Sequence, residues 1–170
     1  MPITRDNLKL ILQARLSGAR RIAVLGVGSD LRSDDAAGML VARMLDERLS
    51  GAIPDGSFAV FFGGTAPENI TGEIKKFAPT HLIIIDALDA GGSPGDIKLI
   101  SPDEIGGASF GTHGLPLKMV TDYLSNFLKC EMIIIGIHPK AIAFGSGVSA
   151  EVESSAKTVS DLIVKIMADL

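Results

Sequence analysis

The stretch IAVLGVGSDLRSDDAAG, residues 22–38, sets the architecture of this chain. It begins as an apolar run that predicts a buried strand, and two glycines then lead into a short polar loop. Asp34 and Asp35 follow as a pair, directly before a helical pattern of apolar residues over 36–49. A strand that leads through a loop and two acids into a helix is one way in which α/β proteins build a binding site.

The two acids of this stretch have different expected roles. We expect Asp34 to cap the following helix or to lie in its first turn, where its charge interacts favourably with the helix dipole. Asp35 also falls in the first turn, and its position is equally compatible with a role in a site. Asp35 is therefore the candidate site residue of the pair.

The rest of the chain alternates apolar runs with helical patterns. A short strand over residues 96–100 follows the preceding strand too closely for a helical crossover, so we expect it to be antiparallel or at an edge. The expected strands are 21–27, 58–62, 81–85, 96–100 and 131–137, and the main helices are 36–49, 67–77, 117–128 and 149–170. This order predicts an α/β three-layer sandwich, with a twisted, mostly parallel sheet of about five strands flanked by helices.

The composition is that of a globular chain that can bury a core. Of its 170 residues 46% are hydrophobic, and the net charge is −4, so we expect one domain over 1–170 and no nucleic-acid partner. Residues 1–20 are expected to form an amphipathic helical extension and not a signal peptide. No apolar stretch reaches the roughly 18 residues that span a bilayer, so no membrane insertion is expected. Cys130 is the only cysteine, which fits a cytoplasmic setting.

Three polar residues are expected to meet at the carboxyl edge of the sheet, where ligands of such sheets bind. Asp86 follows four apolar residues of a buried strand, and an acid there needs partners or a cleft. His113 lies in a glycine-rich loop before a helix, which is not the setting of a core histidine. Together with Asp35 they supply oxygen and imidazole donors, which suit borderline divalent metals such as nickel, zinc or cadmium.

Three further residues have simpler explanations. His138 precedes Pro139 and is expected to start a turn, although it also follows a strand at the carboxyl edge. His81 opens its strand at the opposite edge, where we expect a structural or solvent role. Cys130 precedes a strand and is expected to pack as a small apolar residue without acting as a nucleophile.

The glycines also permit a dinucleotide-binding hypothesis, which the rest of the pattern opposes. Gly26 and Gly28 match the first two glycines of G-x-G-x-x-G, but Leu31 occupies the third position. Phe62 stands where an acid for the ribose is expected, and the chain has no phosphate-binding loop of the form G-x-x-x-x-G-K-[ST]. We therefore expect no dinucleotide and no organic cofactor, and hydrolysis would require water activated by a carboxylate or a metal.

Several motifs in a fixed order give the chain a family resemblance. They are LGVGSDLRSDDAAG (25–38), GGTAPEN (63–69), LIIIDALD (82–89), SPGDI (93–97), THGLPL (112–117) and IIGIHP (134–139). With these motifs the chain resembles the hydrogenase maturation endopeptidases, most closely the type that serves hydrogenase 3 and related membrane-bound hydrogenases.

The resemblance implies an activity and a set of site residues. Family members remove a short C-terminal peptide from the precursor of the nickel–iron hydrogenase large subunit after nickel insertion. The metal-binding residues of the family map onto Asp35, Asp86 and His113, of which Asp35 and Asp86 are also the expected catalytic residues. The nickel would arrive with the precursor and would not be a permanent cofactor, and zinc or cadmium could occupy the same donors.

Two positions depart from the family pattern. The family usually has Asn where this chain has Ser29, and Asp where this chain has Phe62. Phe62 directly precedes Gly63, Gly64 and Thr65, which we expect to contact the substrate. Any role of the missing Asp is therefore not carried over to this chain.

One alternative comes from another functional class. Because no covalent nucleophile is obvious, the chain could be a nickel-sensing chaperone or inspection module that binds the large subunit without cutting it. A nucleotide-binding protein is the third hypothesis, and it depends on two glycines alone.

Overall fold

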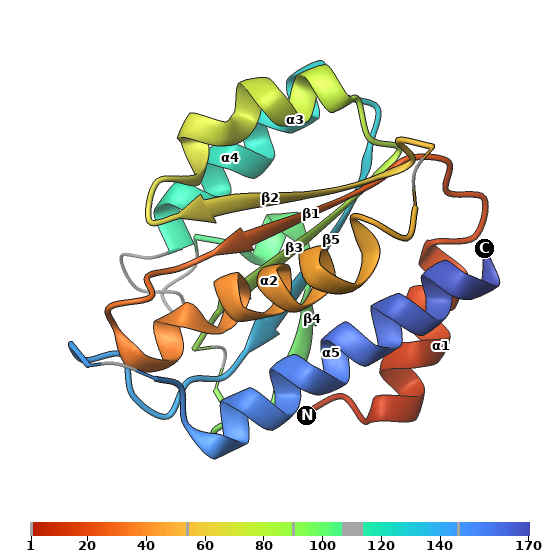
Figure 1. Ribbon diagram of the computed structural model, residues 1–170. Helices are drawn as coiled ribbons and strands as arrows, with labels where there is room; N and C mark the ends of the chain where they lie inside the picture. Colours follow the sequence, from red (N-terminus) through yellow and green to blue (C-terminus); the bar gives the residue numbers. More distant parts are fainter. Residues whose placement is uncertain (1, 54, 90, 107–113, 146) are drawn as a thin grey trace.

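The computed structural model describes residues 2–53, 55–89, 91–106, 114–145 and 147–170. Within these ranges a five-stranded sheet carries helices on both faces (Figure 1). The strands are β1 (Ile22–Val27), β2 (Phe58–Gly64), β3 (His81–Ala87), β4 (Ile97–Ile100) and β5 (Glu131–Ile137). The helices are α1 (Arg5–Arg15), α2 (Ala37–Leu49), α3 (Thr71–Phe77), α4 (Gly114–Phe127) and α5 (Ala150–Asp169), with short 3-10 helices η1 (Ser33–Ala36), η2 (Pro67–Ile70) and η3 (Pro102–Glu104).

The sheet is mixed, and its strand order is β2-β1-β3-β5-β4. β1 pairs in parallel with β2 and β3, and β3 pairs in parallel with β5. β4 lies at the edge and runs antiparallel to β5, as its short connection to β3 requires. The expected α/β fold with a mostly parallel sheet is therefore confirmed.

Alternate residues of the central strands belong to two separate cores. Val24 and Ile83 face the layer of α1, α2 and α5, whereas Leu25 and Ile84 face the layer of α3 and α4. Figure 1 shows these two helical layers on opposite sides of the sheet. Side chains of a strand alternate between its faces, so a strand that is covered on both sides is apolar at every position. This explains the continuous apolar runs of the sequence.

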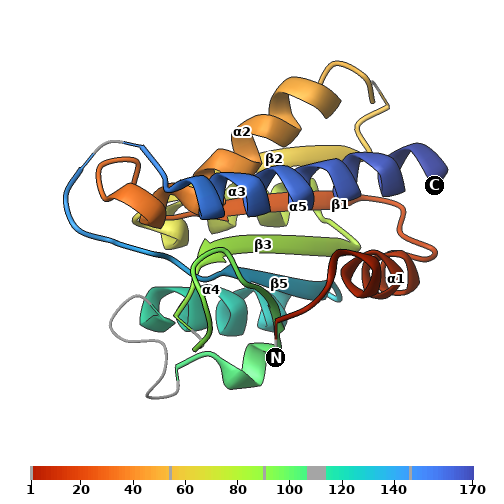
Figure 2. The same cartoon turned by 90° about the horizontal axis from the view of Figure 1, so that it is seen from below.

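The helical extension expected at the N-terminus is α1. Leu8, Leu12 and Leu16 follow one another at a spacing of four residues and are fully buried in the first core. α1 lies beside the C-terminal half of α5 in both views (Figures 1 and 2). No helix within the described ranges is long and apolar enough to cross a membrane.

The helix expected over 67–77 is divided into η2 and α3, and three elements extend beyond their expected bounds. β2 continues to Gly64, because this residue pairs with Val27 across an irregularity in the register. β3 continues beyond Ile85, so Asp86 lies within the strand and pairs with β5. α4 begins at Gly114, three residues early, because a proline is tolerated in the first turn of a helix, where Pro116 lies.

Glycines allow α2 to approach β1 and β3 closely. A Cβ atom on Gly38, in the first turn of α2, would overlap the carbonyl oxygens of Ile85 and Val27. A Cβ atom on Gly26 would lie 2.6 Å from the carbonyl oxygen of Gly38. Since α2 starts just after the acid pair, this close packing fixes the position of the acids relative to the end of β3.

We predict that Gly38→Ala lowers the free energy of unfolding by about 1–3 kcal/mol, because the methyl group meets backbone atoms that cannot rotate away. Urea unfolding of the purified variant measures the change. Gly72→Ala in α3 is the matched control, since nothing lies within 4 Å of its new Cβ atom. The control is expected to be stabilised by up to about 1 kcal/mol. Equal unfolding midpoints for the two variants would contradict the packing argument.

Candidate active site

A crevice opens where the chain changes direction within the sheet. The chain passes from β1 to β2 on one side, and then crosses to β3 on the other side of β1. The connections that follow β1 and β3 leave the sheet in opposite directions, so a crevice forms between them at the carboxyl ends of these two strands. Ligands of such sheets usually bind in this crevice. The loop after β1 and the last residues of β3 border this crevice.

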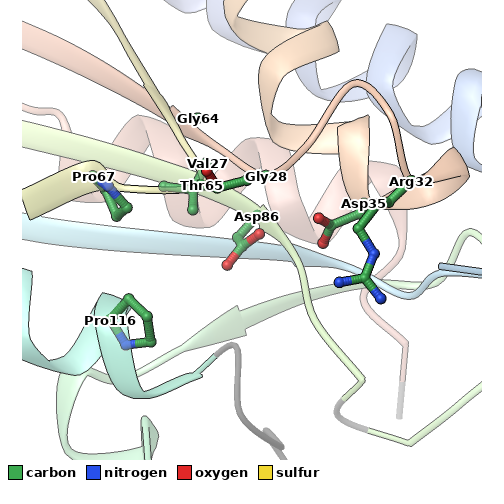
Figure 3. Close-up of a pocket in the computed structure, with 9 residues that line it drawn as sticks. All are labelled: Val27, Gly28, Arg32, Asp35, Gly64, Thr65, Pro67, Asp86 and Pro116. Atoms are coloured by element: carbon green, nitrogen blue, oxygen red, sulfur yellow. The ribbon is translucent and has the colours of Figure 1, made fainter. Parts of the chain in front are cut away.

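The crevice contains a pocket of about 210 Å³ (Figure 3). Its lining combines two carboxylates, one guanidinium group and the backbone of the loops after β1 and β2. The lining residues are Val27, Gly28, Arg32, Asp35, Gly64, Thr65, Pro67, Asp86 and Pro116. Asp35 and Asp86 thus meet in one pocket, as the sequence predicted.

Asp35 is held in place by the backbone of the loop that precedes it. Its carboxylate Oδ2 accepts a hydrogen bond of 3.0 Å from the backbone N–H of Ser29, and its side chain is almost fully buried. Gly28 makes this arrangement possible, because any side chain there would overlap the carbonyl oxygen of Asp35. Gly28 is therefore required because the backbone at Asp35 packs directly against it. The same contact leaves no room for a phosphate group beside Gly28.

Asp86 projects from β3 into the same pocket and is 3% exposed. Burial and, to a smaller extent, the negative charge of Asp35 raise the pKa of its carboxyl group to about 8, against the lowering effect of the hydrogen bond from the Ala87 backbone N–H. The charge of Asp35 therefore disfavours the charged form of Asp86.

The donor set of the pocket fits a divalent cation. In the described part of the chain, no lysine or arginine forms an ion pair with Asp35 or Asp86. A bound cation would relieve the repulsion between the two carboxylates and would favour the charged form of Asp86. His113, the third expected ligand, lies outside the described residues, and no cluster of three ligating side chains occurs within them. α4 nevertheless starts at the pocket, since Pro116 lines it.

Asp34 has a different function from the one expected. The capping prediction is wrong, because its carboxylate makes no hydrogen bond to the start of α2. It accepts hydrogen bonds from the backbone N–H groups of Lys140, Ala141 and Ser149 and from the Ser149 hydroxyl. Asp34 therefore joins η1 to the segment before α5, which is more than a hundred residues away in sequence. Its position in a first turn suggested a local partner, whereas its partners are tertiary.

The other loop residues divide between lining and packing. Gly64 and Thr65 line the pocket, but Gly63 lies against the backbone of Gly26, where a Cβ atom would approach its carbonyl oxygen to 3.0 Å. Phe62 is 41% exposed and is not among the lining residues. The family Asp that it replaces would therefore stand beside the pocket lining and not within it.

The remaining candidate residues do not line the pocket. His81 and Cys130 lie at the opposite end of the sheet, where His81 is 3.7 Å from Glu131. Burial raises the pKa of the Cys130 thiol to about 11, which opposes a role as a nucleophile. The Nδ1 atom of His138 is buried 3.5 Å from the Asp89 carboxylate.

Arg32 is the pocket residue that the sequence analysis missed. It stands two residues before the acid pair, in a loop that was expected to border the site. That position was the available signal, but charged loop residues are common and usually face solvent.

Fold and pocket together define an α/β enzyme whose candidate catalytic groups are carboxylates at the crevice of the sheet. A family model described as hydrogenase maturation protease matches residues 39–166. The chain belongs to this family, and it is therefore a peptidase. The resemblance carried by the sequence motifs is confirmed.

Individual relatives agree over most of the chain. The hydrogenase 3 maturation protease of Escherichia coli K12 is 36% identical over 137 residues, which cover 80% of this chain and 84% of the relative. The crystal structure of the NiFe hydrogenase maturation protease HycI from Thermococcus kodakarensis has a TM-score of 0.82 at 31% identity, with 93% and 99% of the two chains covered. The hydrogenase maturating endopeptidase HybD from Escherichia coli has a TM-score of 0.74 at 25% identity, with 88% and 93% covered.

Proposed function

We propose that this peptidase removes the C-terminal peptide from the precursor of the nickel–iron hydrogenase large subunit after nickel insertion. The relatives named as hydrogenase 3 maturation proteases support this substrate class. The observation that carries the proposal is the pair of buried carboxylates, Asp35 and Asp86, which share one pocket without a cationic partner among the described residues.

The nickel in the precursor is the proposed recognition element. Asp35 and Asp86 would hold it together with His113, because carboxylate and imidazole groups suit a borderline divalent metal. The metal arrives with the substrate, so the pocket is completed only by a precursor that already contains nickel. Zinc or cadmium would occupy the same donors in the isolated protein.

The proposed cleavage uses water, because the described residues provide no activated nucleophile at the pocket. The water oxygen adds to the carbonyl carbon of the peptide bond, and one of the two carboxylates takes a proton from the water. The carbon–nitrogen bond then breaks, and the proton passes to the nitrogen of the released peptide. Asp35 and Asp86 are the carboxylates that lie where this transfer would occur.

The mass of the large-subunit precursor tests the proposal. We expect nickel-loaded precursor to lose the mass of its C-terminal peptide when the protein is added, whereas nickel-free precursor stays intact. Asp35→Asn should abolish the mass change, whereas Asp89→Asn is a control in which an exposed acid outside the pocket is changed. An intact nickel-loaded precursor would contradict the proposal. A precursor that binds tightly but stays intact would instead support the inspection module.

A further inference from the structure

The backbone of Arg32 is hydrogen-bonded within the loop that follows β1. Its backbone N–H donates to the carbonyl oxygen of Ser29 at 3.3 Å, and its own carbonyl oxygen accepts from the N–H of Asp35 at 3.0 Å. Arg32 also forms a bridge with Gly145 in the segment before α5. The backbone of Arg32 is therefore anchored to the same loop that positions the Asp35 carboxylate.

The side chain of Arg32 is anchored at one atom only. Its Nε–H donates to the carbonyl oxygen of Ile142 at 3.2 Å. A guanidinium group has five N–H donors. The bond from Nε–H uses one of them, so the four N–H donors of the two terminal nitrogens remain available. Figure 3 shows the guanidinium group near the carboxylate of Asp35, at the edge of the pocket that also contains Asp86.

The terminal nitrogens of Arg32 have no protein partner among the described residues. No carboxylate there lies within ion-pairing distance of Arg32, although two carboxylates share its pocket. Every Asp and Glu of the chain belongs to the described ranges. A partly buried arginine that is fixed in place without an anionic partner is preorganised to bind an anionic oxygen from outside the chain.

We propose that Arg32 is a further catalytic residue, which binds the carbonyl oxygen of the scissile peptide bond and stabilises the negative charge that develops there. This inference rests on the cleavage proposed above. When the water oxygen adds to the carbonyl carbon, the π electron pair of the carbonyl group moves to its oxygen. The terminal N–H groups of Arg32 donate to that oxygen until the pair returns and the carbon–nitrogen bond breaks. Donors that are fixed before the reaction stabilise such an oxyanion strongly.

The same donors could instead bind a carboxylate of the precursor before the reaction. The two cases differ in their kinetics, because an interaction with the substrate alone changes KM, whereas an interaction made in the transition state changes kcat. The oxyanion role is the one favoured by the position of Arg32, since its guanidinium group shares the pocket of both candidate catalytic carboxylates.

Steady-state cleavage of nickel-loaded precursor by Arg32→Gln tests the proposal. We expect kcat to fall by about 10² to 10³-fold, as for the loss of one oxyanion donor, while KM changes by less than about threefold. Arg32→Lys keeps the charge but not the Nε anchor, so its kcat should be intermediate. Arg43→Gln is the matched control, because Arg43 pairs with Asp30 outside the pocket, and it should cleave like the wild type.

The outcomes separate this inference from the function on which it depends. An unchanged kcat in Arg32→Gln overturns the catalytic role, and a rise in KM alone replaces it with ground-state carboxylate binding. Loss of the folded state in both Arg32 variants, measured by circular dichroism, would assign a structural role and also overturn the proposal. A wild-type protein that leaves the precursor intact would contradict the proposed function itself.

Discussion

Replacing Asp86 with Asn is expected to abolish cleavage of the precursor and, at the same time, to stabilise the folded protein at pH 8 and above. On the proposed mechanism the loss of activity should be at least about 10²-fold, because a neutral amide is a weaker metal ligand than a carboxylate and cannot take a proton from water. The gain in stability follows from the burial of the carboxylate, since an amide fills the same volume without a charge.

The pH dependence of this stability follows from the raised pKa of Asp86. Below pH 3.8 the carboxyl group is protonated in the unfolded and folded chains alike. Between pH 3.8 and about 8 the unfolded chain releases the proton and the folded chain retains it, so the wild type loses stability as the pH rises. Each unit of pKa difference contributes about 1.4 kcal/mol, so the rise from 3.8 to about 8 corresponds to a loss of up to about 6 kcal/mol.

Urea unfolding at pH 4 and pH 8.5 measures the effect. The difference in unfolding free energy between Asp86→Asn and the wild type should be small at pH 4 and should grow to a few kcal/mol at pH 8.5. Asp89→Asn, at the exposed acid three residues later, should show no such growth. A variant that is less stable than the wild type at pH 8.5 would mean that the Asp86 carboxylate has a stabilising partner in the folded protein.

Replacing Asp34 with Ala is expected to have the opposite effect, a destabilisation of about 3–5 kcal/mol at neutral pH. Asp34 is 1% exposed, and its removal leaves three backbone N–H groups and one hydroxyl group without their acceptor. Two of these groups, a backbone N–H and the hydroxyl, belong to Ser149, which also caps α5. The loss should therefore loosen the segment before α5 and the start of that helix.

The lowered pKa of Asp34 indicates that its charged form is the one that stabilises the fold. Burial raises the pKa of Asp34, but hydrogen bonds from Ser149, Lys140 and Ala141 outweigh it, so the net pKa is lowered. A lowered pKa stabilises the fold above the unfolded value of 3.8, and this stability is lost as the pH falls through the folded value. The difference between wild type and Asp34→Ala should accordingly shrink below about pH 4.

Thermal and urea unfolding at pH 7 and pH 3 provide the measurement. Asp35→Asn is a matched control at the adjacent acid, which accepts a single backbone hydrogen bond, and it should cost far less stability than Asp34→Ala. Equal destabilisation by the two substitutions would show that the acids do not divide into a structural and a functional member.

The expected results for Asp34 and Asp86 separate scaffold from site. Removing the carboxylate that is fully hydrogen-bonded weakens the fold, whereas removing the carboxylate that is buried without a cation strengthens it. Residues that reduce stability when no ligand is bound are expected at functional sites, where the ligand supplies the missing interaction.

Much of the architecture could be predicted from local patterns. The continuous apolar runs around Val24 and Ile83 predicted buried strands, and the short connection before Ile97 predicted a strand that is antiparallel or at an edge. The expected meeting of Asp35 and Asp86 followed from the rule that parallel strands end at a common edge. Element bounds were less accurate, since β3 ends only where its pairing with β5 ends.

The sequence by itself determined which segments form strands, which form helices, and at which edge of the sheet the acids stand, because these properties depend on residue periodicity and chain direction. The partners of Asp34, the anchoring of Arg32 by Ile142, and the close approach of Gly38 to Ile85 emerged only from the folded chain. These contacts join segments that are distant in sequence, and no local pattern encodes them. The division between the two acids at residues 34 and 35 is therefore a consequence of tertiary packing.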